Sequence, residues 1–218
     1  HDQITIAIDA MGGEDSPHKC LKGAEIFSSK FDNIKIIFLG DENLINQIIS
    51  NKKIKLRNYD IINTVNNIQD DDSTNTILRN KKESSIFKGL QIVKQTKKSG
   101  FVSSGNTAAI MILSRLILGM IEGIDRPAIC SLIPNKRDYS LMLDLGANVS
   151  SDSNNLFQFA LMGYCYHSIL KNTSEPKIGL INIGTEYNKG KDFLQDACDL
   201  INQSFLKNFF TGYIEPNK

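Results

Sequence analysis

Short runs of apolar and β-branched residues recur along the chain, and most are followed by a stretch with apolar residues at helical spacing. The clearest runs are ITIAID (4–9), IKIIFLG (34–40), GFVSS (100–104) and KIGLINIG (177–184). Glycine or polar residues bound each run, as is usual for strands. Repeated strand–loop–helix units predict a mainly parallel sheet covered by helices on both faces, which is a three-layer α/β/α fold.

The remaining segments complete this prediction. We expect a third strand in KIKLRNYDII (53–62) and a long polar loop, with the acidic run Asp70–Asp72, over 63–80. A hairpin is predicted from RPAICSLIP (126–134) and YSLMLDLG (139–146), joined by a polar turn. Helices are predicted after Ser16-Pro17 as N-cap and first helical residue, after Asp41, over about 84–97, from Asn106 or Thr107, over 150–170 and over 190 to about 206.

Length and composition predict one globular α/β domain over residues 1–218. The chain is 41% hydrophobic and carries a net charge of +1, which argues against a general nucleic-acid or membrane-surface binder. The four cysteines form no CxxC pair and no histidines have metal-ligand spacing, so we expect four buried or half-buried thiols in a reducing cytoplasm. The longest apolar run, AAIMILSRLILGMI, is too short to cross a bilayer, and no signal peptide is expected.

Four predicted strand-to-helix crossings combine glycine with small polar side chains. They are DAMGGEDS (9–16), SSGNTAA (103–109), DLGANVSSDS (144–153) and NIGTEYNKG (182–190). In open α/β sheets the ligand binds at the carboxyl ends of the strands, where helix N-termini offer free N–H groups to anions. Gly12 and Gly13 would let an anion approach the main chain, because a Cβ atom would block it. The four crossings together favour a phosphate or carboxylate site.

Several alternatives bear on this site. A single crossing of this kind is usually plain turn chemistry, and the fingerprints GxGxxG and GxxxxGK[ST] are absent. Lys189 in the first turn of a helix interacts unfavourably with the helix dipole, and a bound anion would offset this cost. Lys191 is expected to extend into water. Asp9, Asp144 and Glu186 at strand ends could hold Mg²⁺, but without fixed spacing we expect them to cap helices or orient neighbouring groups. The basic cluster of Arg79, Lys81 and Lys82 is either solvated surface or a contact for an acidic partner.

Seven motifs in order resemble the phosphate acyltransferase family of bacterial phospholipid synthesis. They are DAMGG (9–13), RNKKESS (79–85), SGNTAA (104–109), RPA (126–128), LDLGAN (143–148), QFALMG (158–163) and GLINIGTEYNKG (179–190). The resemblance implies an enzyme, an acyltransferase that moves a long-chain fatty acyl group from acyl–acyl carrier protein to inorganic phosphate. It also implies a homodimeric fold like that of phosphotransacetylases and isopropylmalate dehydrogenases. The acyl phosphate would pass to a membrane glycerol-3-phosphate acyltransferase that makes lysophosphatidic acid, which implies a cytoplasmic protein at or near the membrane.

The chemistry needs donors for phosphate and for the oxyanion that develops on the carbonyl. The resemblance places phosphate among Gly12, Gly13, Ser104, Asn106 and Thr107. Gly105, Gly146 and Gly184 belong to the same set of phosphate-binding or substrate-binding loops. Lys189 would neutralise charge in the transition state, and Asn148 and Asn182 would donate hydrogen bonds. Asp9, Asp144 and Glu186 would orient these groups. No cofactor, metal or covalent enzyme intermediate is required, because phosphate is the nucleophile.

The chain departs from the family pattern at three places. Glu14 and Asp15 stand where the family commonly reads DAMGGDHAP, so the histidine is absent, and Ala108 replaces a glycine of AGNTGA. Family members also continue beyond TGYIEPNK, with a further Asp-Gly motif and a region linked to dimerisation and membrane contact, so we expect a missing C-terminal part. Alternatives are a phosphotransacetylase-like enzyme using acyl-coenzyme A and a non-catalytic binder of a phosphate ligand. A nicotinamide dehydrogenase is disfavoured by the absent dinucleotide fingerprint.

Overall fold

The computed structural model describes residues 3–65, 68, 72–80, 83–136, 138–173, 175–182 and 192–215. The chain divides into two compact units, residues 1–119 and 120–218. Each unit has its own sheets and its own clusters of buried side chains. The expectation of a single domain therefore stays a prediction, and the units are described in turn.

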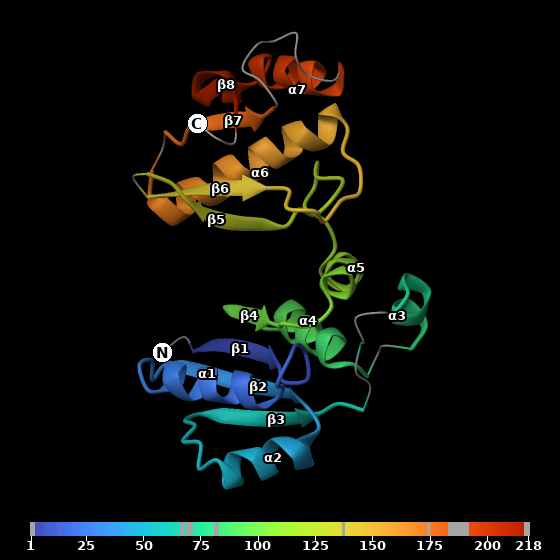
Figure 1. The fold of residues 1–218 in the computed structure, drawn as a ribbon, viewed down its shortest axis with the longest axis vertical. Helices are drawn as coiled ribbons and strands as arrows, with labels where there is room; N and C mark the ends of the chain where they lie inside the picture. The colour runs from blue at the N-terminus through green and yellow to red at the C-terminus, as the bar shows by residue number, and fades with distance from the viewer. Residues whose placement is uncertain are drawn as a thin grey trace. The chain divides into compact units, whose positions relative to one another are not determined.

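The first unit is built on a four-stranded parallel sheet (Figure 1), as the sequence predicts. Its strands, in the spatial order β3-β2-β1-β4, are β3 Tyr59–Asn63, β2 Ile34–Gly40, β1 Ile4–Asp9 and β4 Ser99–Val102. β3 is shorter than expected, because Lys53 and Asn58 both have positive φ and break the extended backbone before Tyr59.

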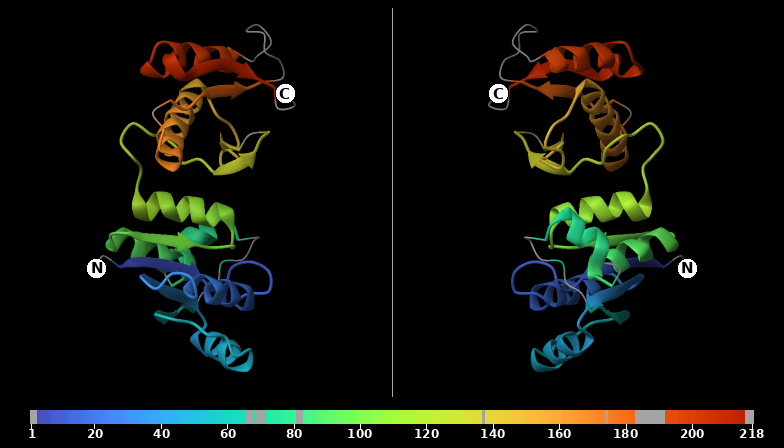
Figure 2. Two further views of the ribbon diagram at one scale, coloured as in Figure 1. Left: turned by 90° about the vertical axis from the view of Figure 1, so that its left-hand side faces the viewer. Right: turned by 90° about the vertical axis from the view of Figure 1, so that its right-hand side faces the viewer.

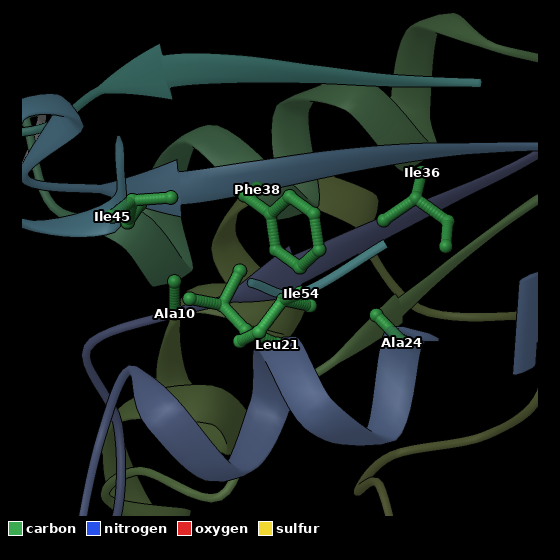
Figure 3. Close-up of a cluster of buried hydrophobic side chains, with 7 residues drawn as sticks. All are labelled: Ala10, Leu21, Ala24, Ile36, Phe38, Ile45 and Ile54. Carbon is green, nitrogen blue, oxygen red and sulfur yellow. The ribbon is translucent and has the colours of Figure 1, made fainter. Parts of the chain in front are cut away.

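Helices cover both faces of this sheet (Figure 2). α1 His18–Ser28, α2 Glu42–Asn51 and α4 Ser85–Gln95 pack on it. The unit also contains α3 Thr74–Asn80 and α5 Thr107–Leu118, which pack with α4. On one face, side chains of α1 and α2 pack on β2, as Figure 3 shows for Leu21, Ile45 and Phe38. On the other face α4 comes so close that a Cβ on Gly89 would lie 2.3 Å from the ring of Phe101. The sheet is therefore the middle of three layers.

Two local predictions for this unit are wrong. The N-cap of α1 is Pro17 and no side chain caps it, because the hydroxyl of Ser16 donates to the carbonyl of Gly12 instead. Part of the segment predicted as a loop forms the short helix α3. Its Ile77 is 1% exposed and packs with Ile86 and Leu113, and this burial stabilises a helix that is too short to persist alone.

The second unit combines an antiparallel hairpin with a parallel pair of strands. Its elements are β5 Cys130–Pro134, β6 Tyr139–Leu143, α6 Ser153–Lys171, β7 Ile178–Ile181, α7 Asp192–Asn202, a 3₁₀ helix Phe205–Phe209 and β8 Phe210–Ile214. The predicted hairpin is confirmed. β8, which pairs with β7, was not predicted, because its five residues follow the last helix without a distinct turn signal.

Buried side chains of α7, β7 and β8 form the core of this unit, and α6 packs against it. Asp152 is the N-cap of α6, and its carboxylate accepts from the backbone N–H of Asn155 in a capping box. In the described part of the chain, no helix is both long and apolar enough to cross a membrane.

Candidate functional site

The loops after β1 and β4 meet at the carboxyl edge of the first sheet. Ile8 is paired with Val102, so the next residues along, Asp9 and Ser103, are neighbours. The Ser103 hydroxyl donates to Asp9 Oδ2 at 2.7 Å, and the backbone N–H of Met11 donates to Asp9 Oδ1 at 3.1 Å. Asp9 is only 3% exposed, so these donors replace the water that a buried carboxylate would lose.

Gly12, Gly13 and Gly105 are needed for the contact between these two loops. A Cβ on Gly12 would lie 2.5 Å from Asp9 Oδ2 and 2.7 Å from the backbone nitrogen of Gly105. A Cβ on Gly13, which has a φ of +83°, would lie 2.8 Å from the Cβ of Ser104. The adjacent glycines are therefore explained by close packing of one loop on the other, a reason that the sequence did not reveal.

The loop after β4 leads into the N-terminus of α5. The side chain of Asn106 accepts from the backbone N–H of Ala109 at 2.8 Å, which confirms that the helix starts at Thr107. The N–H groups of Thr107 and Ala108, in the first turn, have no carbonyl partner within an α-helix. Both residues are exposed, so this helix end can present two backbone donors and a partial positive charge to an anion.

In the second unit, Asp144 follows β6 and holds its own loop together. Its carboxylate accepts from the backbone N–H groups of Ile129, Ala147 and Asn148 at 2.8, 3.2 and 2.9 Å, and from the Asn148 side chain at 3.0 Å. Burial raises the pKa of Asp144, but these hydrogen bonds outweigh burial and hold its pKa below the ordinary value. Gly146, with a φ of +89°, makes the turn.

Asn148 is held within this loop as well. Its side-chain nitrogen donates to the carbonyl of Pro127 at 2.9 Å and to Asp144. An amide nitrogen has two hydrogens, so both are used inside the loop. Asn182 follows β7, is 6% exposed and donates its backbone N–H to the carbonyl of Ile214 at 3.0 Å. Both residues thus lie at the carboxyl ends of strands, as predicted.

The structure thus brings together seven predicted residues in the first unit, namely Asp9, Gly12, Gly13, Ser104, Gly105, Asn106 and Thr107. In the second unit it brings together Asp144, Gly146 and Asn148 in one loop. Gly184, Glu186 and Lys189 lie outside the described residues, as do Lys81 and Lys82.

Comparison with known proteins gives the family. Residues 4–218 match the family model described as "Fatty acid synthesis protein". The chain belongs to this family. The phosphate acyltransferase of Nitrosococcus oceani is 39% identical over 215 residues, which cover 98% of this chain and 63% of the relative. That of Wolbachia pipientis subsp. Culex pipiens is 38% identical over 222 residues, covering 100% of this chain and 64% of the relative. The resemblance is confirmed, and the chain spans less than two thirds of these relatives.

Solved structures show the same fold at much lower sequence identity. A phosphotransacetylase from Streptococcus pyogenes has a TM-score of 0.73 at 17% identity, covering 98% of this chain and 68% of that chain. The EutD phosphotransacetylase from Staphylococcus aureus has a TM-score of 0.67 at 16% identity, covering 98% of this chain and 69% of that chain. The predicted phosphotransacetylase-like α/β fold is confirmed.

The motif QFALMG of this family has a structural explanation. Gln158 is 5% exposed, and its side chain donates to Asp125 Oδ2 at 2.7 Å and accepts from the Asp125 backbone N–H at 2.8 Å. The next residue, Arg126, donates to the carbonyl of Ser150 at 2.9 Å. These bonds fix α6 to the segment that carries Pro127, which in turn accepts from Asn148. Gln158 therefore supports the loop of Asp144 through Asp125 and Pro127. The sequence did not indicate this role for Gln158.

A cavity of about 350 Å³ lies between β6, α6 and β7. Aliphatic and aromatic side chains form most of its wall, and Ser140, His167 and Lys177 also line it. Among the described residues, none of the predicted site residues lines this cavity. In the described part of the chain there is likewise no group of three or more histidine, cysteine or acidic residues that could hold a metal ion. The expectation that all four thiols are buried or half-buried is wrong for Cys130 and Cys165, which are exposed.

Proposed function

We propose that the protein transfers a long-chain fatty acyl group from acyl–acyl carrier protein to inorganic phosphate and releases acyl phosphate. The single observation that carries the proposal is the match to phosphate acyltransferases over nearly the whole chain, at 39% identity in one case. The loops at the strand ends support it, since they place backbone donors where an anion can bind.

In this reaction the phosphate oxygen attacks the thioester carbonyl, the C–S bond breaks, and the carrier-protein thiol leaves. The site must bind a dianion and also stabilise the oxyanion that forms on the carbonyl. We assign phosphate to the loops of Gly12, Gly13 and Ser104 and to the N-terminus of α5 at Asn106 and Thr107. The free N–H groups at that helix end supply donors without any reorganisation.

Lys189 is assigned to neutralise the charge that builds up in the transition state, and Asn182 to donate to the substrate. Asn148 has a different role in the proposal, because both hydrogens of its amide already bond within the loop. It therefore positions the Asp144 loop, with Gly146 at the turn. Gly184 and Glu186 are assigned to the loop that carries Lys189.

The bonds of the two described carboxylates support an orienting role for them. Asp9 accepts from a hydroxyl and an N–H group, and Asp144 accepts four hydrogen bonds. Carboxylates used in this way have few lone pairs left for Mg²⁺. The proposed chemistry accordingly runs through phosphate as the nucleophile, with no metal or other cofactor.

The proposal includes the protein's setting. Acyl carrier protein is the donor, and the active form is a homodimer in the cytoplasm. The product is an acyl phosphate with a long apolar chain, which favours release at a membrane surface and transfer to a membrane glycerol-3-phosphate acyltransferase. Transient peripheral contact with the membrane is therefore part of the proposal.

The reaction is tested by measuring free thiol released from palmitoyl–acyl carrier protein by the full-length gene product, with and without phosphate. Phosphate-dependent release, with the acyl phosphate trapped by hydroxylamine, is the expected result. No release by folded protein that binds phosphate would contradict the proposal and leave a non-catalytic phosphate binder.

Lys189→Ala is the first variant to test, with Lys191→Ala as its matched control. Loss of a group that stabilises transition-state charge is expected to lower kcat by about 10²–10³-fold and to change phosphate affinity much less. Lys191→Ala should keep the wild-type rate, because that side chain is expected to extend into water. Equal rates in the two variants would remove Lys189 from the mechanism.

The alternative donor is acyl-coenzyme A, which is favoured by the likeness of the fold to phosphotransacetylases. The same thiol assay decides between them when palmitoyl-coenzyme A and acetyl-coenzyme A replace the carrier-protein substrate. The proposal requires kcat/KM for the carrier-protein donor to exceed that for either coenzyme A donor.

A further inference from the structure

We propose that Ser103 is a positioning residue, which transmits the orientation of Asp9 to the N-terminus of α5 and so places the backbone donors for phosphate. This inference rests on the proposed function and adds a residue to it. Ser103 lies beside Ser104, which the motif pattern favours, but the two hydroxyls have different surroundings. Ser103 is half-buried between the loops, whereas Ser104 is exposed.

The direction of the hydrogen bonds at Ser103 follows from chemistry. The backbone nitrogen of Gly105 lies 3.0 Å from Ser103 Oγ and can only donate. Ser103 Oγ therefore accepts there, and its own hydrogen points to Asp9 Oδ2 at 2.7 Å. A hydroxyl has one donor and two acceptor sites, so a single serine can make both bonds at once. The carboxylate thereby fixes the direction of the hydroxyl, and the hydroxyl fixes the peptide group of Gly105.

Gly105 is directly followed by the N-cap of α5, so its peptide group sets where the helix begins. Asn106 caps the helix through the N–H of Ala109, and the N–H of Ile110 makes the first intrahelical bond, to the Asn106 carbonyl at 3.1 Å. The N–H groups of Thr107 and Ala108 remain for a ligand. Since Ser103 ties this turn to β1, we expect its loss to shift these two donors.

Asp9 is well suited to act through Ser103 and poorly suited to touch phosphate itself. The Asp9 side chain is 3% exposed, and Gly12 and Gly105 lie close against its carboxylate. Its negative charge would also repel a bound anion. An acid at this position is useful because a carboxylate only accepts, which leaves the serine hydroxyl one orientation. Asp9 and Ser103 together thus hold the backbone N–H groups at the start of α5 in a fixed arrangement.

The test is Ser103→Ala in the full-length protein, with phosphate varied in the thiol-release assay at saturating palmitoyl–acyl carrier protein. We expect KM for phosphate to rise about 10-fold or more while kcat changes less, because misplaced donors weaken binding of the nucleophile. Ser103→Thr keeps the hydroxyl and should restore KM to near the wild-type value.

Ser99→Ala is the matched control, since Ser99 lies at the other end of β4 and its hydroxyl donates to the Thr96 carbonyl at 2.6 Å. A purely structural role would lower the active fraction, and therefore kcat, equally in both alanine variants. Ser103→Ala with the phosphate KM of Ser99→Ala, or Ser103→Thr no better than Ser103→Ala, would overturn the inference.

Isothermal titration with inorganic phosphate separates this inference from the proposed reaction. If wild-type protein binds phosphate but releases no thiol, the reaction is wrong, and weaker binding by Ser103→Ala still supports the inference. If wild-type protein turns over and Ser103→Ala behaves as wild type, the inference is wrong and the reaction stands. If wild-type protein binds no phosphate, both are wrong.

Discussion

Asp9 and Asp144 each stand at the carboxyl end of a strand before a glycine-containing loop, but they hold these loops by different contacts. Asp9 bonds to Ser103, 94 positions away, and its loop packs on the backbone of Gly105. Asp144 bonds mostly to residues three and four positions further along its own loop. The comparison teaches that one local motif, an acid before a glycine turn, can either join two segments far apart in the sequence or hold mainly its own loop, with one bond to a segment 15 positions back.

Substitution at the joint between distant segments should cost most. In Gly12→Ala the new Cβ would meet the Asp9 carboxylate at 2.5 Å and the backbone of Gly105 at 2.7 Å. The backbone cannot rotate away, and the carboxylate would have to give up its hydrogen bonds to do so. We expect a loss of about 3 kcal/mol in the free energy of unfolding, measured by urea denaturation. The control is Gly23→Ala within α1, where a Cβ meets nothing within 4 Å and helix propensity should add about 0.5–1 kcal/mol.

A Gly12→Ala protein as stable as wild type would show that the two loops separate readily. The close contact between them would then not fix the site, and the comparison between the two loops would lose its basis.

Asp144→Asn should cost about 2 kcal/mol at neutral pH. An amide in place of the carboxylate turns one acceptor into a donor, which would face N–H groups that now lack a partner. Because the folded-state pKa of Asp144 is lowered, its stabilising effect is complete above its ordinary pKa and is lost as the pH falls. The difference between wild type and variant should therefore be constant near neutrality and shrink below about pH 4.

Urea midpoints of both proteins from pH 7 to pH 3 check this. If the difference in stability between wild type and Asp144→Asn stays the same from pH 7 to pH 3, the negative charge of Asp144 does not stabilise its loop.

Gly146→Ala should cost about 1 kcal/mol, less than Gly12→Ala, because only backbone conformation opposes it. Gly146 has a φ of +89°, but a Cβ there would meet no atom within 4 Å. Gly146→Asn is the matched variant, since asparagine tolerates positive φ better and should recover part of the loss. If Gly146→Ala costs as much as Gly12→Ala in the same urea series, crowding is not what distinguishes the two loops.

Much of this was predictable from the sequence. The period of the apolar runs predicted the parallel sheet of the first unit. Asp41 correctly marked the start of α2, and the start of α5 was correctly placed at Asn106 or Thr107. Such signals are local, because a cap and the N–H group that it binds lie within one turn of each other. Among the described residues, the acids Asp9 and Asp144 and the glycines beside them lie after strand ends, where they were expected.

The contacts that explain these residues were not predictable, because they join positions distant in sequence. The role of Ser103 depends on β4 lying next to β1. From the sequence alone, Ser103 could not be distinguished in this role from the adjacent Ser104. The short helix α3 is stabilised by burial of Ile77 against α4 and α5. The mostly polar residues around Ile77 in the sequence gave no sign of this burial. We predicted an open path for an anion to the main chain at Gly12, whereas the space beside Gly12 is filled by the loop of Gly105.

The smallest effect tests whether the charge of Asp9 acts on a neighbouring side chain. Burial and, as the second cause, the negative charge of Asp9 together raise the pKa of Cys20 to about 11. Asp9→Asn removes the second cause, so alkylation of Cys20 by iodoacetamide at pH 8.5 should become a few times faster. Mass spectrometry of the digested protein measures the rate at each cysteine separately.

Cys198 provides an internal control in the same sample. Its pKa is raised by burial and by the charge of Asp199, neither of which Asp9→Asn changes, so its rate should stay constant. Faster reaction at both cysteines would indicate general loosening of the protein instead. An unchanged rate at Cys20 in a folded variant would mean that the side chain of Asp9 does not act on the Cys20 thiol. Asp9 would then resemble an ordinary turn residue more than the carboxylate of Asp144 does.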